Sequence, residues 1–209
     1  MSDIQIYGPP QSNYVWTARM TAEEKGITHE LVGVEFGSES HRALHPFAKV
    51  PSMKHGDFTL HETSAIARYI DRAFDGPALQ PADPKSAARM DQWISSLNDY
   101  YYDDIIRKVV INRILKPILG GEPDEAEIAA ALPRIESKLA ILGAHLAETP
   151  YLAGADPSLA DFFLAPMLAS LERTAEGRTL LADAPKVAEW RQRIQARPSF
   201  VATQPPAAK

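Results

Sequence analysis

The chain has 209 residues, of which 45% are hydrophobic and 23% are charged, and these values are ordinary for a globular protein that buries a core. Its formal net charge of −5 argues against a nucleic-acid partner, because phosphate binding requires clustered Lys and Arg side chains. No apolar run reaches the roughly 18 residues of a membrane span, and the first residues lack the basic and apolar regions of a signal peptide, so we expect a cytoplasmic protein without a membrane partner.

The sequence contains no cysteine, and this excludes disulfides, thiolate metal sites and a protein thiol that acts as a nucleophile. The six histidines have no spacing typical of metal ligands, so we expect no metal. Any sulfur chemistry must therefore use a sulfur atom that a substrate supplies.

Residues 1–76 combine short strand patterns with helix patterns in the order β-α-β-α-β-β-α, which predicts an α/β domain. Ser12 is a good N-terminal cap for a helix, and Lys25-Gly26 is a good C-terminal end. His55-Gly56-Asp57 predicts a hairpin turn. The predicted elements are a strand at 3–7, a helix from Ser12 to Gly26, a strand at 30–34, a helix at 38–44, strands at 51–54 and 58–60, and a helix at 62–74.

Residues 77–84 are the predicted linker, since the stretch from Asp75 to Pro84 carries three prolines and a glycine. Residues 85–209 contain only helix patterns, so we expect a second, all-helical domain. Ser158 and Asp161 have the spacing of a capping box, which we interpret as structural. The predicted helices are 85–119 (one long helix or two in line), 124–148, 158–172 and 186–197.

Two adjacent motifs in the first domain suit an extended peptide. Proline cannot donate a hydrogen bond to a sheet, so Pro51 belongs at the start or edge of a strand. A cis Val50–Pro51 bond would leave the Val50 N–H and C=O free to pair with a peptide, whereas a trans bond would only open the strand. Glu62 and Thr63 begin a helix, where unpaired N–H groups favour a carboxylate and the Glu62 side chain can accept an ammonium; an ordinary helix cap is the alternative. Together these motifs suit a γ-glutamyl peptide.

The segment Lys49-Val50-Pro51, the hairpin and the residues from Leu60 to Ile70 closely resemble the glutathione-binding segment of cytosolic glutathione transferases. The resemblance covers nearly the whole chain. It implies an α/β thioredoxin-like N-terminal domain followed by an all-α helical C-terminal domain. It also implies a homodimer that takes glutathione as co-substrate.

The resemblance assigns roles in glutathione binding. Val50, next to Pro51, would pair its backbone with the cysteinyl unit. Glu62 and Thr63 would hold the γ-glutamyl end. The residues implied for the glycyl carboxylate are Lys49, with His45 or His41.

The reaction requires a group that stabilises the glutathione thiolate. The pKa of a free thiol, about 8.5, must fall by about one to two units for reactivity near neutral pH. A hydroxyl donor at a helix N-terminus can supply much of this change. Ser12 has that position, in a segment that resembles the serine-type, bacterial-type members of the family. The alternatives are Asn13, Tyr14 and Tyr7.

The resemblance implies that the electrophile binds between the domains, against the long helix that follows the linker. Tyr100 and Tyr101 offer flat apolar surface there, and Arg107 can attract an anionic electrophile. Packing inside the domain or in a dimer interface is the alternative for each of them.

These observations predict a cytoplasmic glutathione transferase that adds the thiolate to small hydrophobic electrophiles, a reaction of detoxification. Glutathione-dependent peroxide reduction at the same thiolate stays open, as does a non-catalytic interaction module with the same fold. The presence of Glu62, Thr63 and the Ser12 hydroxyl favours the enzyme over the module.

Overall fold

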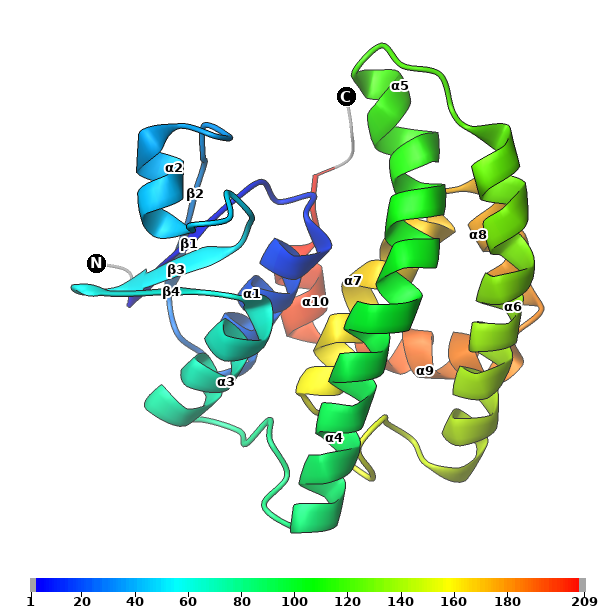
Figure 1. The fold of residues 1–209 in the computed structure, drawn as a ribbon. Coiled ribbons are helices and arrows are strands. Elements are labelled where there is room, and N and C mark those ends of the chain that lie inside the picture. Colours follow the sequence, from blue (N-terminus) through cyan, green and yellow to red (C-terminus); the bar gives the residue numbers. More distant parts are fainter. Residues whose placement is uncertain (1–2, 207–209) are drawn as a thin grey trace. The chain divides into compact units, whose positions relative to one another are not determined.

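A computed structural model of the chain describes residues 3–206 (Figure 1). These residues form two compact units: an N-terminal unit of residues 3–80 and 196–206, and a helical unit of residues 81–195. The first combines a sheet with helices and the second is built from helices, which confirms the fold class expected from the sequence. Within the described residues, no helix has both the length and the apolar character of a membrane span.

The N-terminal unit is built on a mixed sheet of four strands in the order β2-β1-β3-β4. Strand β1 runs parallel to β2 and antiparallel to β3, and β3 runs antiparallel to β4. The elements of this unit are β1 (Ile4–Tyr7), α1 (Asn13–Glu24), β2 (His29–Val32), α2 (Glu39–Leu44), β3 (Ser52–His55), β4 (Phe58–His61), α3 (Thr63–Ala73) and α10 (Pro198–Thr203).

The alternating pattern of the first strand separates the two faces of the sheet. Ile4 and Ile6 of β1 are at most 1% exposed, whereas Gln5 and Tyr7 are partly exposed. Burial of apolar side chains against this face is the main stabilising contribution to the unit. The other fully buried members of the core are Val15, Ala18, Ala22, Met53, Ile66 and Ile70.

The end of the described chain belongs to the N-terminal unit because α10 packs along α1. The Trp16 ring lies 4.9 Å from the Phe200 ring, and its Nε1–H donates to Thr203 Oγ1 at 2.9 Å. Arg197 donates to both carboxylate oxygens of Glu24, at 2.7 and 2.6 Å. The sequence prediction places no helix here and gives the residues after 84 to the helical domain. The hydrogen-bonded partners lie 173 to 187 positions apart, and no local pattern reveals such a pairing.

The segment after α3 is fastened to the N-terminal unit by a buried ion pair. Lys25 Nζ lies 3.2 Å from Asp71 Oδ1, and the two side chains are 3% and 6% exposed. Lys25 also donates to the Pro77 carbonyl at 2.9 Å, and Asp71 accepts the Leu79 N–H at 2.9 Å. The first residues of the predicted linker, 77–84, therefore pack with the sheet domain.

The helical unit contains α4 (Pro84–Ser96), η1 (Leu97–Tyr101), η2 (Asp103–Leu115), α5 (Lys116–Ile118), α6 (Glu125–Glu148), α7 (Leu159–Glu172), α8 (Ala175–Ala182) and α9 (Pro185–Gln195). The first four follow one another as a rod, drawn in green in Figure 1, which agrees with the helix predicted for 85–119. Segments η1 and η2 are π-helical, with N–H groups that donate to carbonyls five residues back. The prediction missed α8, because its eight residues are too few for a clear helical period.

A fully buried carboxylate, Asp161, organises the core of the helical unit. Its Oδ2 accepts the Ser158 N–H at 2.9 Å and the Ser158 hydroxyl at 3.0 Å, so the predicted capping box is present. Its Oδ1 accepts the Leu152 N–H at 3.0 Å and the Trp190 Nε1–H at 2.8 Å. Four donors therefore offset part of the cost of burying this charge, although burial still raises the pKa of Asp161.

A second buried carboxylate, Asp104 of η2, is 4% exposed. It accepts hydrogen bonds from Lys108 Nζ at 2.9 Å and from Arg134 Nε at 3.0 Å, and it also pairs with Lys138. Because Arg134 and Lys138 belong to α6, this cluster joins α6 to η2.

Candidate active site

Gly8 brings two predicted parts of the site together, the start of α1 and the loop before β3. Its φ is +140°, and a Cβ atom there would lie 2.6 Å from Val15 Cγ2 and 3.0 Å from Val50 Cβ. Real Cβ atoms do not approach other atoms so closely. Glycine is therefore required for α1 and Val50 to pack at this distance.

Ser12 is the N-terminal cap of α1, as the sequence predicts. Its hydroxyl oxygen accepts the Val15 N–H at 3.4 Å, and its own N–H donates to the Pro9 carbonyl at 3.1 Å. The side chain is half-buried. Within residues 3–206, no acceptor takes the hydroxyl hydrogen. This hydrogen is free to be donated at the positive end of α1.

The alternatives to Ser12 have other engagements. Tyr7 donates its hydroxyl hydrogen to Gln5 Oε1 at 2.8 Å, and burial, with the Glu30 carboxylate, raises the pKa of Tyr7. Asn13 is buried and Tyr14 is half-buried, and both have interactions within the protein. Among these groups, Ser12 is the one for which the described residues show an unused hydrogen-bond donor.

Val50 lies just outside the sheet. The Val50–Pro51 peptide bond is cis, and the pairing of β3 with β1 begins at Ser52. Among the described residues, no backbone hydrogen bond joins the Val50 N–H or C=O to the sheet. The preceding carbonyl, of Lys49, is bound by His41 Nε2 at 2.9 Å, and the Lys49 side chain is exposed.

A pair of histidine rings lies beside this loop. The His45 ring is 2% exposed, and its centroid lies 4.7 Å from that of His61. Its Nδ1 accepts the Phe47 N–H at 3.3 Å, so the neutral ring carries its proton on Nε2. Burial, together with His61, lowers the pKa of His45, which keeps the ring neutral at physiological pH.

The N-terminus of α3 has no side-chain cap. Glu62 has φ 70° and ψ 118°, a costly conformation for a residue other than glycine. Its carboxylate is exposed and does not cap the helix, while the Thr63 side chain is 7% exposed. The N–H groups of the first turn therefore keep their positive partial charge, next to a free carboxylate. Such a site can receive a carboxylate and an ammonium group together.

The three residues predicted to contact the electrophile have different surroundings in the helical unit. Tyr101 is 3% exposed, donates its hydroxyl to the Lys138 carbonyl at 3.1 Å, and has a pKa that burial raises. Tyr100 is 63% exposed. The Arg107 side chain is also exposed, and its guanidinium lies 5.7 Å from the Tyr102 ring. Tyr101 therefore packs in the core, and Tyr100 and Arg107 lie on the surface.

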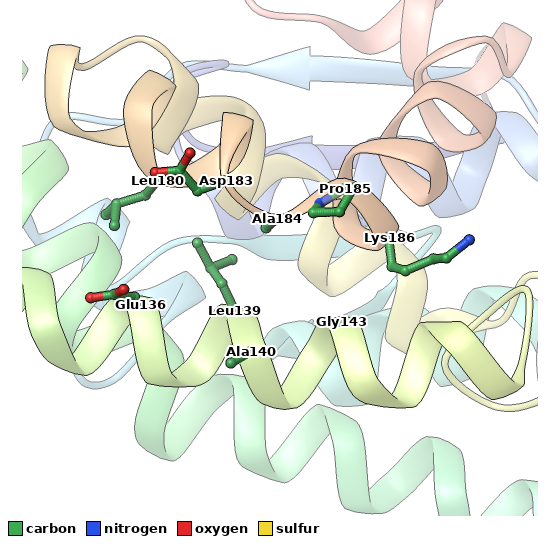
Figure 2. A pocket seen from close by; sticks show the side chains of 9 residues that line it. All are labelled: Glu136, Leu139, Ala140, Gly143, Leu180, Asp183, Ala184, Pro185 and Lys186. Carbon is green, nitrogen blue, oxygen red and sulfur yellow. The ribbon is translucent and has the colours of Figure 1, made fainter.

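A hollow of about 350 Å³ lies within the helical unit, between α6 and the junction of α8 and α9 (Figure 2). Leu139, Ala140 and Gly143 form its α6 side. Glu136 and Lys186 lie at opposite ends, and the Lys186 ammonium points away from the hollow. The residues predicted to bind glutathione do not line it. In the part of the chain that the structure describes, no three His, Asp or Glu side chains form a possible metal site.

Gly8 is not among the residues predicted from the sequence, and for Tyr101 the sequence left open whether it contacts the electrophile or packs inside the domain. For Gly8 the only signal is its place directly after the first strand. For Tyr101 the signal is a spacing of four with Trp93, Leu97 and Ile105, all of which are at most 8% exposed.

Known proteins match nearly the whole chain. The pattern of the glutathione S-transferase N-terminal domain matches residues 6–78, and that of the C-terminal domain matches residues 125–193. Glutathione S-transferase 3 of Zea mays is 33% identical over 212 residues, which cover 97% of this chain and 94% of the relative.

Two solved structures extend this likeness to the fold. A glutathione S-transferase III in apo form has a TM-score of 0.91 and 32% identity and covers 100% of both chains. Glutathione S-transferase I from mais, in complex with an atrazine glutathione conjugate, has a TM-score of 0.89 and 27% identity, with coverage of 99% of this chain and 100% of the other. The matched range 6–78 includes the motifs around Ser12, Val50 and Glu62. The chain is a glutathione transferase and belongs to the glutathione S-transferase family.

Proposed function

We propose that this enzyme uses glutathione as its co-substrate and transfers the thiolate to small hydrophobic electrophiles. The observation that carries the proposal is a set of open polar groups in the N-terminal unit: the Val50 backbone, the start of α3 and the Ser12 hydroxyl. Gly8 holds the first of these against α1, the helix that Ser12 caps. The mais enzyme in complex with a glutathione conjugate gives further support.

Each open group matches one part of glutathione. The Val50 N–H and C=O, before Pro51, would pair with the cysteinyl unit as a strand does. The N-terminus of α3 and the Thr63 hydroxyl would bind the γ-glutamyl carboxylate, and Glu62 would bind its ammonium. Lys49 would face the glycyl carboxylate, with the Nε2–H of His45 as a further donor.

Ser12 would donate its hydroxyl hydrogen to the glutathione sulfur and stabilise the thiolate. A pKa lowered by two units corresponds to about 2.7 kcal/mol of preference for the ionised form. A hydrogen bond to a charged acceptor, with the helix dipole behind it, supplies an energy of this size. Asn13 is the neighbouring residue that would assist, while Tyr7 has less support because its hydroxyl already donates to Gln5.

For the electrophile, we propose contacts with Tyr100 and Arg107, which are exposed. The aromatic ring offers apolar surface and the guanidinium attracts an anionic substituent. Peroxide reduction at the same thiolate is the second candidate activity. A non-catalytic module has less support, because no described residue uses the Ser12 donor. We also propose a cytoplasmic homodimer with C2 symmetry. Light scattering would measure its mass.

Thermal unfolding with and without millimolar glutathione tests the binding half of the proposal. A ligand of the native state raises its stability, by about 2.7 kcal/mol at one hundred times the Kd. We expect a higher Tm with glutathione and no change with the same concentration of glycine. An equal Tm in both solutions would contradict the glutathione site.

Ser12→Ala tests the chemical half. We expect kcat/KM for chlorodinitrobenzene to fall by about tenfold to a hundredfold at neutral pH, because the pKa of the bound thiol returns toward about 8.5. Glutathione affinity should change little, and Ser12→Thr should keep most of the rate. If Ser12→Ala keeps the full rate and Tyr7→Phe loses it, the activating group is Tyr7. Running each variant with cumene hydroperoxide as well compares conjugation with peroxide reduction.

A further inference from the structure

His41 lies in α2 and is only 2% exposed. Its Nδ1 accepts a hydrogen bond from the Gly37 N–H at 3.2 Å, and its Nε2 lies 2.9 Å from the Lys49 carbonyl oxygen. Because Nδ1 accepts, the proton of the neutral ring is on Nε2 and is donated to Lys49. Both polar atoms of the ring are therefore engaged inside the protein, and neither is left for a ligand.

The Lys49 carbonyl and the Val50 N–H belong to one peptide group. A peptide group is planar, so in the trans form its N–H points opposite to its C=O. A donor that fixes the direction of the Lys49 carbonyl therefore fixes the direction of the Val50 N–H as well. No strand pairing does this, since the pairing with β1 begins at Ser52.

The His41 ring is itself held in place. Its backbone N–H donates to Ser38 Oγ, the cap of α2, at 3.1 Å. The ring also forms a T-shaped contact with Phe36, with 5.4 Å between the ring centroids. A ring that is buried, bonded on both nitrogens and packed on an aromatic neighbour has few other orientations.

We propose that His41 is a positioning residue for the glutathione transferase reaction. It holds the peptide between Lys49 and Val50 so that the Val50 N–H faces the cysteinyl unit of glutathione, and it does not contact glutathione itself. This role takes the place of the direct contact with the glycyl carboxylate that the family resemblance implies for His41. The inference rests on the proposed glutathione site.

Two substitutions test the roles of the two ring nitrogens separately. In His41→Asn, the shorter amide can still accept from Gly37 but does not reach Lys49. In His41→Gln, the amide nitrogen replaces Nε2 and can still donate to the Lys49 carbonyl. His145→Asn is the matched control, because His145 Nε2 also bonds a carbonyl, that of Leu152 at 3.0 Å, but in the helical unit.

Two kinds of measurement are made on each variant. Calorimetry and kinetics give the Kd and the KM for glutathione. Hydrogen–deuterium exchange of the protein without ligand gives the exchange rate of a fragment that contains residues 48–52. If His41→Asn leaves about one molecule in ten with the peptide correctly oriented, the apparent Kd and KM rise about tenfold. The rate at saturating glutathione and the KM for the electrophile should stay close to those of the wild type. The fragment should exchange faster. His41→Gln should restore affinity to within about threefold, and His145→Asn should change neither quantity.

Wild-type affinity and exchange in His41→Asn would overturn the proposal. So would an equal loss of affinity in the Asn and Gln variants with unchanged exchange, because that result means that His41 contacts the ligand directly. Failure of the proposed function gives a different result, since the wild type would then bind no glutathione. The exchange of residues 48–52 would in that case still decide whether His41 holds the loop.

Discussion

Ser12 and Ser158 hold the same position in two helices, the N-terminal cap, but they use it differently. Ser158 is 1% exposed, and both its N–H and its hydroxyl donate to Asp161. Ser12 is half-buried, and its hydroxyl accepts a single N–H at 3.4 Å. A closed cap can only support its helix, whereas an open cap keeps a donor for a ligand.

The same difference separates two pairs of charged residues, one in each unit. In the helical unit, Asp104 and Asp161 each accept several hydrogen bonds. In the N-terminal unit, the side chains of Lys49 and Glu62 make no hydrogen bond or ion pair with any described residue. We therefore expect substitutions of the first pair to lower the free energy of unfolding, and substitutions of the second pair to change glutathione binding.

Asp161→Ala should have the largest effect on stability. It leaves the N–H of Leu152, the N–H and hydroxyl of Ser158 and the Nε1–H of Trp190 buried without an acceptor. Because each unsatisfied buried group is costly, we expect the free energy of unfolding to fall by about 4 kcal/mol. Urea unfolding followed by circular dichroism measures this change.

Ser158→Ala is the control for this prediction. It removes one donor and keeps the Ser158 backbone bond to Asp161, so the loss should be about 1 kcal/mol. Both variants should bind glutathione with wild-type affinity when folded. A loss below about 1 kcal/mol in Asp161→Ala would mean that the closed network does not stabilise the helical unit.

Asp104→Asn should have the next largest effect, about 2 kcal/mol at pH 7, because it removes the charge that three cationic side chains bond. Burial acts to raise the pKa of Asp104, but these hydrogen bonds outweigh it and hold the pKa well below its ordinary value. A carboxyl group of this kind contributes its full stability above its unfolded pKa of about 4, and loses it as the pH falls toward the folded pKa.

The difference in stability between wild type and Asp104→Asn should therefore be largest near pH 7 and shrink below about pH 4. Asp103→Asn is the control, since its side chain is 43% exposed and forms surface ion pairs, and it should cost less than about 1 kcal/mol. A difference that stays constant between pH 7 and pH 3 would show that the charge of Asp104 is not responsible.

Much of the fold follows from local sequence signals. The cap at Ser12, the hairpin at His55-Gly56-Asp57 and the capping box at Ser158 depend on neighbours within a few positions, and all three are present. The placement of α10 on α1 depends on pairs such as Trp16 and Thr203. Tertiary packing alone brings such pairs together, so the sequence did not predict them.

The candidate site also combines features that local sequence signals predict with features that depend on tertiary packing. The motif at Val50 and Glu62 is visible in the sequence because the backbone conformations of strand start and helix start have residue preferences. The bond from His41 to Lys49 and the approach of Val50 to Gly8 depend on how the loop packs, and no spacing predicts them. The sequence therefore indicated which residues could contact a ligand, but it did not indicate which residues hold them in place.

Glu62→Gly should change stability and function in opposite directions. Glycine adopts φ 70° without strain, so the free energy of unfolding should rise by about 1 kcal/mol. The variant also loses the carboxylate that would bind the γ-glutamyl ammonium, and we expect glutathione affinity to fall about tenfold, the loss of one charge-assisted hydrogen bond. Calorimetry and urea unfolding measure the two effects.

Glu62→Gln separates these effects, because it keeps the strained backbone and removes only the charge. It should lower affinity without the gain in stability. If Glu62→Gly binds glutathione as the wild type does, the open carboxylate has no part in binding, and the contrast between the two units would hold for stability alone.

Gly143→Ala should have the smallest effect, and it tests whether the helical unit is fully packed. Gly143 lies inside α6, and a Cβ atom there would meet nothing within 4 Å. Alanine loses less conformational entropy than glycine in a helix, so we expect a gain of about 0.5–1 kcal/mol in thermal or urea unfolding. Gly177→Ala is the matched contrast, because its Cβ would meet the Leu171 carbonyl oxygen, and it should cost about 1–3 kcal/mol. A loss of stability in Gly143→Ala would mean that the hollow beside α6 is filled in solution, since an empty hollow has nothing for the added methyl group to displace.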